Sequence, residues 1–325
     1  MYKWQKKQWE NIIQRRHSLP HAFLVRGRAG IGKHDFAYTL SKALLCRTPV
    51  NQQACDACPS CIWFAEGHHP DFRLITPEEA EVSEDAPKKK AAKKGQISVT
   101  QVRQLFDYLN LSKHQAQSMR IILISPAETF NAASANALLK MLEEPPANTL
   151  FLLVSSQSQR LLPTIVSRCQ SLDMELPGKV EALAWLEQQG VGNAEVALAY
   201  AGGAPLLALS SSLEDNRDLT QQLAQGAKLK PFVAAPMFMS MNMERALEIL
   251  QKWIFDLMSY QLSRQFHYHL EHSAALQALC KSVNLRLLLR FQQTLVEAKK
   301  TANHPLSNEM QLENLLLQYT YIFKG

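Results

Sequence analysis

The stretch VRGRAGIGKHDFAYTL, residues 25–40, decides the fold because it contains most of a phosphate-binding loop. Such loops follow the pattern G-x-x-x-x-G-K-[S/T]: backbone N–H groups surround the phosphates, the lysine reaches the outer phosphates, and the hydroxyl completes a Mg²⁺ shell. Here the hydroxyl position holds His34. The candidate phosphate-binding residues are Gly27, Gly30, Gly32 and Lys33. The stretch predicts the cradle and its cation without the metal-holding oxygen, so ATP binding is expected to be weak or vestigial.

Short apolar runs on both sides of this loop have the length and β-branched content of buried parallel strands. They cover residues 22–25, 72–75, 121–124 and 150–154. Helices are expected between them, one behind an N-cap at Ser98 and one over residues 131–144 that Pro145 ends. Strands that alternate with helices predict a doubly wound α/β domain, with its ligand at the carboxyl ends of the strands, where the loop begins.

The second half of the chain has the pattern of an all-helical protein. No glycine occurs between Gly226 and Gly325, and residues 243–266 and 284–302 carry long amphipathic repeats. A smaller helical unit precedes them, with boundaries near Asp173 and Ser212. The predicted domains are 1–173 (α/β), 174–212 (a small helical lid) and 213–325 (all-helical).

Composition restricts the class of protein. The chain has 325 residues, of which 46% are apolar and 20% charged, as expected for a soluble globular protein of two or three domains. The charged, aromatic N-terminus and the lack of a long apolar run predict a cytoplasmic protein rather than a secreted or membrane protein. A net charge of +6 permits contact with nucleic acid. The lysine-rich run 77–96 is expected to be a surface loop, with contact to DNA phosphates as the alternative.

A cysteine cluster gives the strongest local signal. The spacing C-x8-C-x2-C-x2-C lets four thiolates close the tetrahedral shell of one ion, which predicts structural zinc rather than a redox pair. The ligands are Cys46, Cys55, Cys58 and Cys61. Other candidates are interpreted structurally: His68 and His69 as turn residues, and Cys169 and Cys280 as packing residues. The histidines 267, 269 and 272 are expected at a polar helix end.

The remaining parts of an ATPase site are absent from the sequence. Such a site needs acids at the end of a central strand to hold Mg²⁺ and orient water. After the run 121–124 stand Ser125, Pro126 and Ala127, and Glu128 lies too far along for an unchanged turn. Glu143 and Glu144, at a helix end before prolines, are interpreted as surface charges. A simpler interpretation, a turn that merely contains glycines, stays open for the loop.

The segments ANALLKMLEEPPANTLFLLVSS (135–156) and LLPTIVSRCQ (161–170) resemble the core of bacterial clamp-loader subunits of the AAA+ superfamily. The resemblance extends over nearly the whole chain. It implies an AAA+ domain that carries zinc, a small helical lid, and a helical collar that joins other loader subunits in a five-membered ring. With ATP, this ring opens the sliding clamp and closes it around primed DNA, as part of the DNA-directed DNA polymerase holoenzyme, a nucleotidyltransferase complex.

The departures from the ATPase members favour a stator that does not hydrolyse ATP. The lid arginine of the ATPase members is replaced by Ala204 before Pro205. By the same resemblance, Arg168 of the SRC motif is the arginine presented in trans to the ATP of a neighbouring subunit. Two alternatives stay open. One is an active ATPase in which His34 is tolerated and Glu128 substitutes for the missing acids, and the other is a zinc-bearing DNA-binding module.

Overall fold

The computed structural model describes the chain except for residues 78–94, 112–118, 211–213, 240, 302–307 and 324–325. The five lysines of the predicted surface loop, and the predicted boundary at Ser212, lie outside the described residues. The chain divides into two compact units, Met1–Gly178 and Lys179–Gly325. No helix among the described residues is long and apolar enough to cross a membrane.

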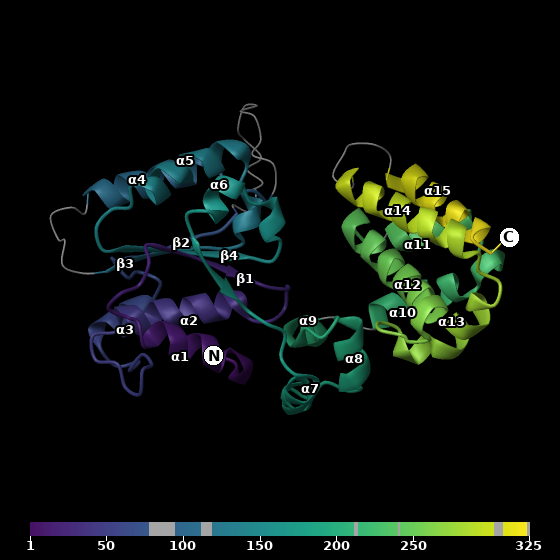
Figure 1. Ribbon diagram of the computed structural model, residues 1–325, viewed down its shortest axis with the longest axis horizontal. Helices are drawn as coiled ribbons and strands as arrows, with labels where there is room; N and C mark the ends of the chain where they lie inside the picture. Colours follow the sequence, from purple (N-terminus) through teal and green to yellow (C-terminus); the bar gives the residue numbers. More distant parts are fainter. Residues whose placement is uncertain (78–94, 112–118, 211–213, 240, 302–307, 324–325) are drawn as a thin grey trace. The chain divides into compact units, whose positions relative to one another are not determined.

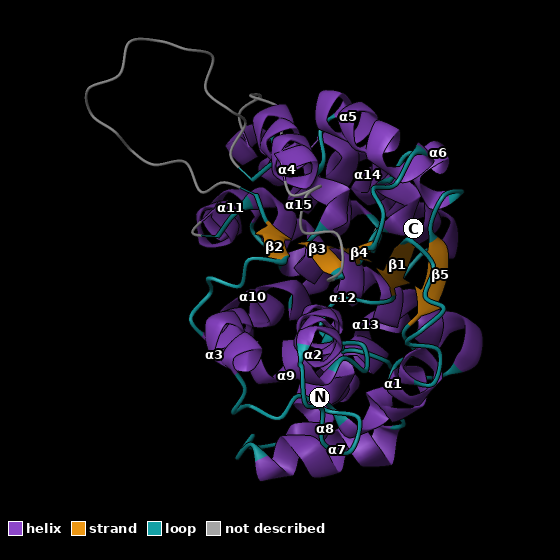
Figure 2. Ribbon diagram, turned by 90° about the vertical axis from the view of Figure 1, so that its left-hand side faces the viewer, coloured by secondary structure: helices purple, strands orange, loops and turns teal. Residues whose placement is uncertain are grey.

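The first unit is built on a five-stranded parallel sheet with the strand order β2-β3-β4-β1-β5 (Figure 2). The strands are β1 (Ala22–Arg26), β2 (Phe72–Ile75), β3 (Arg120–Ile124), β4 (Thr149–Ser155) and β5 (Gln170–Asp173). The four expected strands are confirmed. β5 was not expected because it is a polar edge strand, with three of its four residues exposed, and leaves no apolar run in the sequence.

Helices cover both faces of this sheet, which confirms the doubly wound α/β fold. Figure 1 shows α4, α5 and α6 on one face and α1, α2 and α3 on the other. Their bounds are α1 (Lys6–Ile13), α2 (Lys33–Leu45), α3 (Pro59–Ala65), α4 (Val99–Leu111), α5 (Ala132–Glu143) and α6 (Pro163–Val166). Leu138 and Ile165 bury one face of the sheet, whereas Phe36 and Leu40 of α2 are fully buried on the other.

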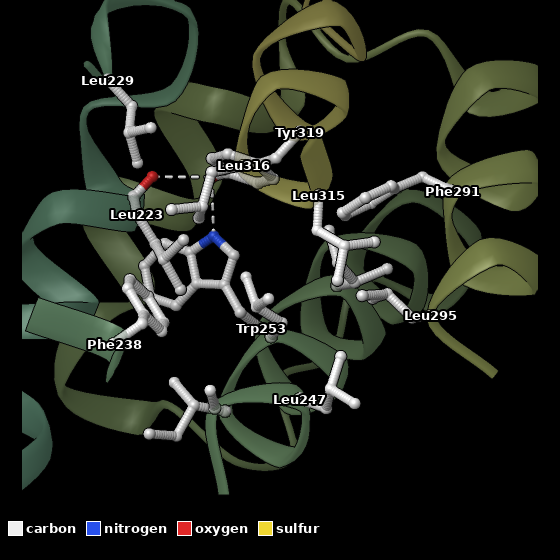
Figure 3. Close-up of a cluster of buried hydrophobic side chains, with 14 of the residues drawn as sticks. Leu223, Leu229, Phe238, Leu247, Trp253, Phe291, Leu295, Leu315, Leu316 and Tyr319 are labelled. Carbon is white, nitrogen blue, oxygen red and sulfur yellow. Dashed lines mark hydrogen bonds between the residues drawn. The ribbon is translucent and has the colours of Figure 1, made fainter. Parts of the chain in front are cut away.

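The described part of the second unit is entirely helical, as predicted. It contains α7 (Lys179–Gln188), α8 (Ala194–Tyr200), α9 (Pro205–Ser210), α10 (Glu214–Ala224), α11 (Pro231–Met239), α12 (Met243–Ser263), α13 (Ser273–Cys280), α14 (Leu285–Thr301) and α15 (Asn308–Tyr321). Figure 3 shows the centre of its larger core, where the indole N–H of Trp253 donates to the Tyr319 hydroxyl at 2.9 Å. That hydroxyl donates in turn to the Leu223 carbonyl at 2.6 Å, so both buried polar groups are satisfied.

The interpretation of the histidines as a polar helix end is wrong for His269. This side chain is buried, and its Nδ1 lies 2.9 Å from Oδ2 of the fully buried Asp256. Asp256 also accepts the backbone N–H groups of His267, Tyr268 and His269. Burial alone raises the pKa of Asp256, but the hydrogen bonds to its carboxylate outweigh burial and lower the pKa. The pair thereby fixes the segment before α13 to α12.

Candidate functional site

The glycines of the phosphate loop are required by its backbone. A Cβ on Gly27 would lie 2.4 Å from the Met174 carbonyl oxygen, so only glycine permits this close approach. Gly30 and Gly32 adopt left-handed conformations, with φ of 76° and 80°. The loop therefore has a sharply turned backbone that leads from β1 directly into α2 at Lys33.

Lys33 is engaged within its own chain. Its side chain lies in the interior, with the residue only 5% exposed, and Nζ donates to the Arg28 carbonyl and, at 3.0 Å, to the Ser156 hydroxyl. Burial lowers the pKa of Lys33 to about 8, although the nearby carboxylate of Glu128 acts in the opposite direction. The loop cation thus bonds to the loop itself and to the end of β4.

The N-terminal residues Tyr2, Trp4 and Gln5, here called the aromatic clasp, cover the outside of the loop. A Cβ on Gly32 would lie 2.4 Å from the Tyr2 ring, which shows how closely the ring packs on the loop. Gln5 Nε2 donates to the carbonyls of Ile31 and Gly32 at 3.0 and 2.8 Å, and the Trp4 indole donates to Ile31 at 3.0 Å. The sequence contained a signal for this contact only in the aromatic character of the N-terminus.

The two positions at which an ATPase would hold its metal carry neither the hydroxyl expected after the lysine nor the acid expected at the end of the strand. His34 is exposed at the start of α2, and Ser125 is buried at the end of β3. Glu128 lies close enough to influence Lys33, and its Oε1 accepts the backbone N–H of Ser156 at 3.0 Å. Its Oε2 is buried and has no hydrogen-bond partner among the described residues. Glu128 is therefore held at the end of β4, close enough to the loop cation to act on it electrostatically.

Arg168 lies on the turn between α6 and β5. Its Nη1 donates to the Thr164 carbonyl at 3.0 Å, and its Nη2 lies 2.8 Å from Oε1 of Glu143. The side chain is 35% exposed. Glu143 is a surface charge as predicted, but the sequence did not reveal its ion pair with Arg168, because the two residues are far apart in the chain and meet only where α5 and α6 pack.

The four predicted ligand cysteines come together. Their sulfur atoms all lie within 4.8 Å of one another, so the cluster could hold a metal ion. Cys46 follows α2, whereas Cys58 and Cys61 lie at the start of α3. Cys55 Sγ accepts the Thr48 hydroxyl and backbone N–H groups, which lowers the pKa of Cys55 to about 6. A thiolate is the ligand form of cysteine, so one ligand is ready at neutral pH.

His69 helps to hold the cysteine module together through its contact with Ser60. It is buried, and its Nε2 lies 2.8 Å from the Ser60 hydroxyl, which donates to the Leu45 carbonyl at 2.7 Å. The ring therefore joins the end of α2 to the start of α3 rather than binding a metal with the cysteines. Cys169 and Cys280 are buried and apart from the cluster, in agreement with a packing role.

Comparison with known proteins gives consistent matches. The family described as "DNA polymerase III, delta subunit" matches residues 3–177, and "DNA polymerase III, delta subunit, C terminal" matches residues 210–320. "DNA polymerase III subunit delta'" of Pseudomonas aeruginosa is 37% identical over 274 residues, 81% of this chain and 79% of that protein. The protein of the same name from Escherichia coli is 30% identical over 69% of this chain and 64% of its own length. "DNA polymerase III subunit tau" of Salmonella typhimurium is 30% identical over 53% of this chain and 27% of that protein.

Proposed function

Because this chain belongs to the DNA polymerase III delta' subunit family, we propose that it is a cytoplasmic clamp-loader subunit that does not hydrolyse ATP. In this proposal it acts as the stator of the loader and supplies Arg168 to the ATP site of a neighbouring subunit. The observation that carries the proposal is the contrast between two cations: Lys33 is buried and bonded within the loop, whereas Arg168 is partly exposed on a surface turn.

The absence of turnover follows from the loop. ATP hydrolysis needs a positioned Mg²⁺ and an oriented water. His34 and Ser125 stand where the metal-holding oxygens belong, and the Lys33 ammonium is already bonded to protein oxygens. The active-ATPase alternative rests on Glu128, whose Oε2 is buried without a partner among the described residues. Its other oxygen, however, is held by the Ser156 N–H, which fixes it as a support for the end of β4.

A trans role for Arg168 follows from its donors. A guanidinium carries five N–H donors and binds phosphate oxygens in a planar fork, and an arginine supplied in trans stabilises the charge that develops on the transferred phosphoryl group. Nη1 of Arg168 donates to the Thr164 carbonyl and the Ser167 hydroxyl, and Nη2 forms an ion pair with Glu143. Among the described residues these contacts do not use the Arg168 Nε–H, so the guanidinium keeps donor capacity for a phosphate of an adjacent subunit.

The second unit supplies the surfaces for assembly with delta-type and gamma/tau-type subunits in a five-membered ring. Helices α7 to α9 have a buried cluster of their own around Leu186 and Leu198, separate from the larger core around Trp253. This separation supports a lid over 174–212 and a collar over 213–325. On α11, Phe232 and Val233 are 70% and 63% exposed, as suits a face that packs against another collar. The sliding clamp and primed DNA are then partners of the whole complex.

We assign structural zinc to the cysteine cluster. Four cysteine sulfurs close a tetrahedral shell, whereas a catalytic zinc site keeps one position open for water or substrate. The ion would be held by Cys46, Cys55, Cys58 and Cys61 and would join the end of α2 to the start of α3. Metal analysis of the chain purified without chelator should give about one zinc per molecule, and a chain without zinc would contradict the assignment.

Two measurements on the unmodified chain test the function. Mixed with delta-type and gamma/tau-type subunits, the chain should enter one stable complex whose mass, from light scattering, fits a five-membered ring. Alone, it should show no ATP turnover above background. Hydrolysis by the isolated chain that Lys33→Ala abolishes would establish the active-ATPase alternative. Tight, salt-sensitive binding of primed DNA by the isolated chain, without assembly, would establish the DNA-binding alternative.

A further inference from the structure

The ion pair between Glu143 and Arg168 joins two surface positions with rigid backbones. Glu143 is the last residue of α5, and Pro145 and Pro146 follow its helix end. Its neighbour in the chain, Leu142, is 2% exposed, and Cys169, which follows Arg168, is buried in the same core. Because both partners project from anchored backbone, the 2.8 Å contact between Arg168 Nη2 and Glu143 Oε1 is set by the fold.

We propose that Glu143 is a positioning residue for Arg168, an inference that rests on the trans-arginine function proposed above. A free arginine side chain loses much rotamer freedom when it is fixed against a ligand. Glu143 fixes Nη2 while the Thr164 carbonyl fixes Nη1, so this loss is incurred before the neighbouring ATP is reached. Arg168 is thereby presented in one orientation.

The geometry of the ion pair favours a role in which Glu143 orients Arg168 over a role in which Glu143 holds Arg168 away from ATP. The carboxylate contacts the guanidinium through the ion pair of its Oε1 with Nη2 at 2.8 Å. A carboxylate that sequestered the arginine would help to bury it, but the Arg168 side chain is 35% exposed. The two roles predict opposite signs: loss of a positioning carboxylate slows hydrolysis, whereas loss of a restraining one accelerates it.

The test uses the complete loader, reconstituted with Glu143→Ala, Glu143→Gln or Glu144→Ala in this chain. Glu144 is the matched control, since it is the adjacent exposed acid and makes no ion pair or side-chain hydrogen bond among the described residues. With clamp and primed DNA present, Glu143→Ala should lower the clamp-loading rate about threefold to tenfold. It should lower the kcat for ATP without changing KM, because the contact of Arg168 strengthens in the transition state. Glu143→Gln should recover part of the rate, since its amide oxygen still accepts, and Glu144→Ala should match wild type.

A double variant separates this inference from the function on which it rests. In a loader that already carries Arg168→Ala, adding Glu143→Ala should produce no further loss, because the carboxylate acts only through the arginine. An unchanged or faster Glu143→Ala loader, or a further loss in the Arg168→Ala background, would overturn the inference. A normal Arg168→Ala loader would instead overturn the trans-arginine function itself. Light scattering of each complex checks that all variants assemble.

Discussion

The phosphate loop follows the carboxyl end of β1 and the Arg168 turn precedes the amino end of β5, and each presents a cation in different surroundings. Around Lys33, the chain supplies its own acceptors, and the aromatic clasp of Tyr2, Trp4 and Gln5 covers the loop from outside. Around Arg168, one carboxylate and one carbonyl hold the guanidinium while much of it stays exposed. The availability of a cation for catalysis is therefore decided by its neighbours rather than by the motif that contains it.

The first prediction tests the exposed cation. In a reconstituted loader, Arg168→Ala should reduce clamp loading by at least about tenfold, since arginines supplied in trans contribute about 10³ to 10⁵ in rate at the site that they serve. Total ATPase should fall only in part, because the other ATP sites of the ring do not use this residue. Arg168→Lys should not restore loading, since lysine lacks the planar fork. Steady-state ATPase and fluorescence-based loading assays measure both quantities.

A matched control for this experiment is Arg160→Ala. Arg160 is an exposed arginine of the same unit, and among the described residues its Nη1 bonds locally, to the Gln157 side chain at 3.2 Å. Its removal should leave loading unchanged. Equal losses in the two variants would point to a general charge effect, and normal loading with Arg168→Ala would leave the exposed cation without a catalytic role.

The second prediction concerns the cysteine cluster, which lies at the far end of the helix that the phosphate loop begins. Cys58→Ser should release the proposed zinc and speed amide hydrogen exchange across residues 46–61 and the last turn of α2. Metal binding to such a cluster contributes directly to local folding. The Arg168 turn is far from the cysteines in the sequence of the first unit. This turn and helices α10 to α15 should keep wild-type protection from hydrogen exchange. Global unfolding in Cys58→Ser, or zinc retained at wild-type content, would contradict this prediction.

The sequence predicted the architecture well where one class of residue recurs in a regular pattern. Buried strands such as 121–124 and 150–154 are continuous apolar runs, and the cysteine spacing directly encodes a common ligand geometry. The strand β5 was missed because an exposed edge strand needs no apolar run. The glycine and lysine pattern located the loop, but the pattern is the same whether its lysine is free or bonded.

The contacts that the sequence did not predict join residues that are not neighbours in the chain. Glu143 meets Arg168 across 25 positions of sequence, and Tyr2 meets Asp35 across 33. Asp256 and His269 form a buried pair that no local sequence pattern predicts, because each residue alone is typical of a polar surface. Side-chain partners of this kind follow from tertiary packing, which one sequence does not specify residue by residue.

The third prediction tests the clasp that covers the loop. Tyr2→Ala removes a ring packed against Gly32 and the hydroxyl that donates to Asp35 at 2.8 Å. Loss of an aromatic side chain of this partial burial, with one hydrogen bond, should destabilise the loop by about 1 to 3 kcal/mol and speed hydrogen exchange at residues 27–36. ATP turnover should stay at background, since the metal-holding oxygens are still missing. Turnover that begins on removal of the clasp would show that the loop is a covered working site rather than a vestigial one.

The smallest effect is expected from Lys33→Met, the change that is most damaging in a working phosphate loop. Loaders that carry it should load clamps and hydrolyse ATP as wild type does, because no ATP is proposed to depend on this lysine.

The stability of the isolated Lys33→Met chain should be equal to or higher than that of wild type at pH 7, since burial disfavours the ammonium and lowers the pKa of Lys33 to about 8, against about 10.4 in an unfolded chain. Below pH 8 the lysine is charged in the folded and the unfolded state, and the full cost of burying the charge destabilises the folded state. As the pH rises from about 8 toward 10, the folded state loses its proton first, so the cost of burying the charge decreases. The stability of wild type then rises relative to that of the variant. Urea unfolding of both proteins at pH 7 and pH 9.5 measures this change. A Lys33→Met loader that assembles but fails to load clamps would make the buried cation functional and remove its contrast with Arg168.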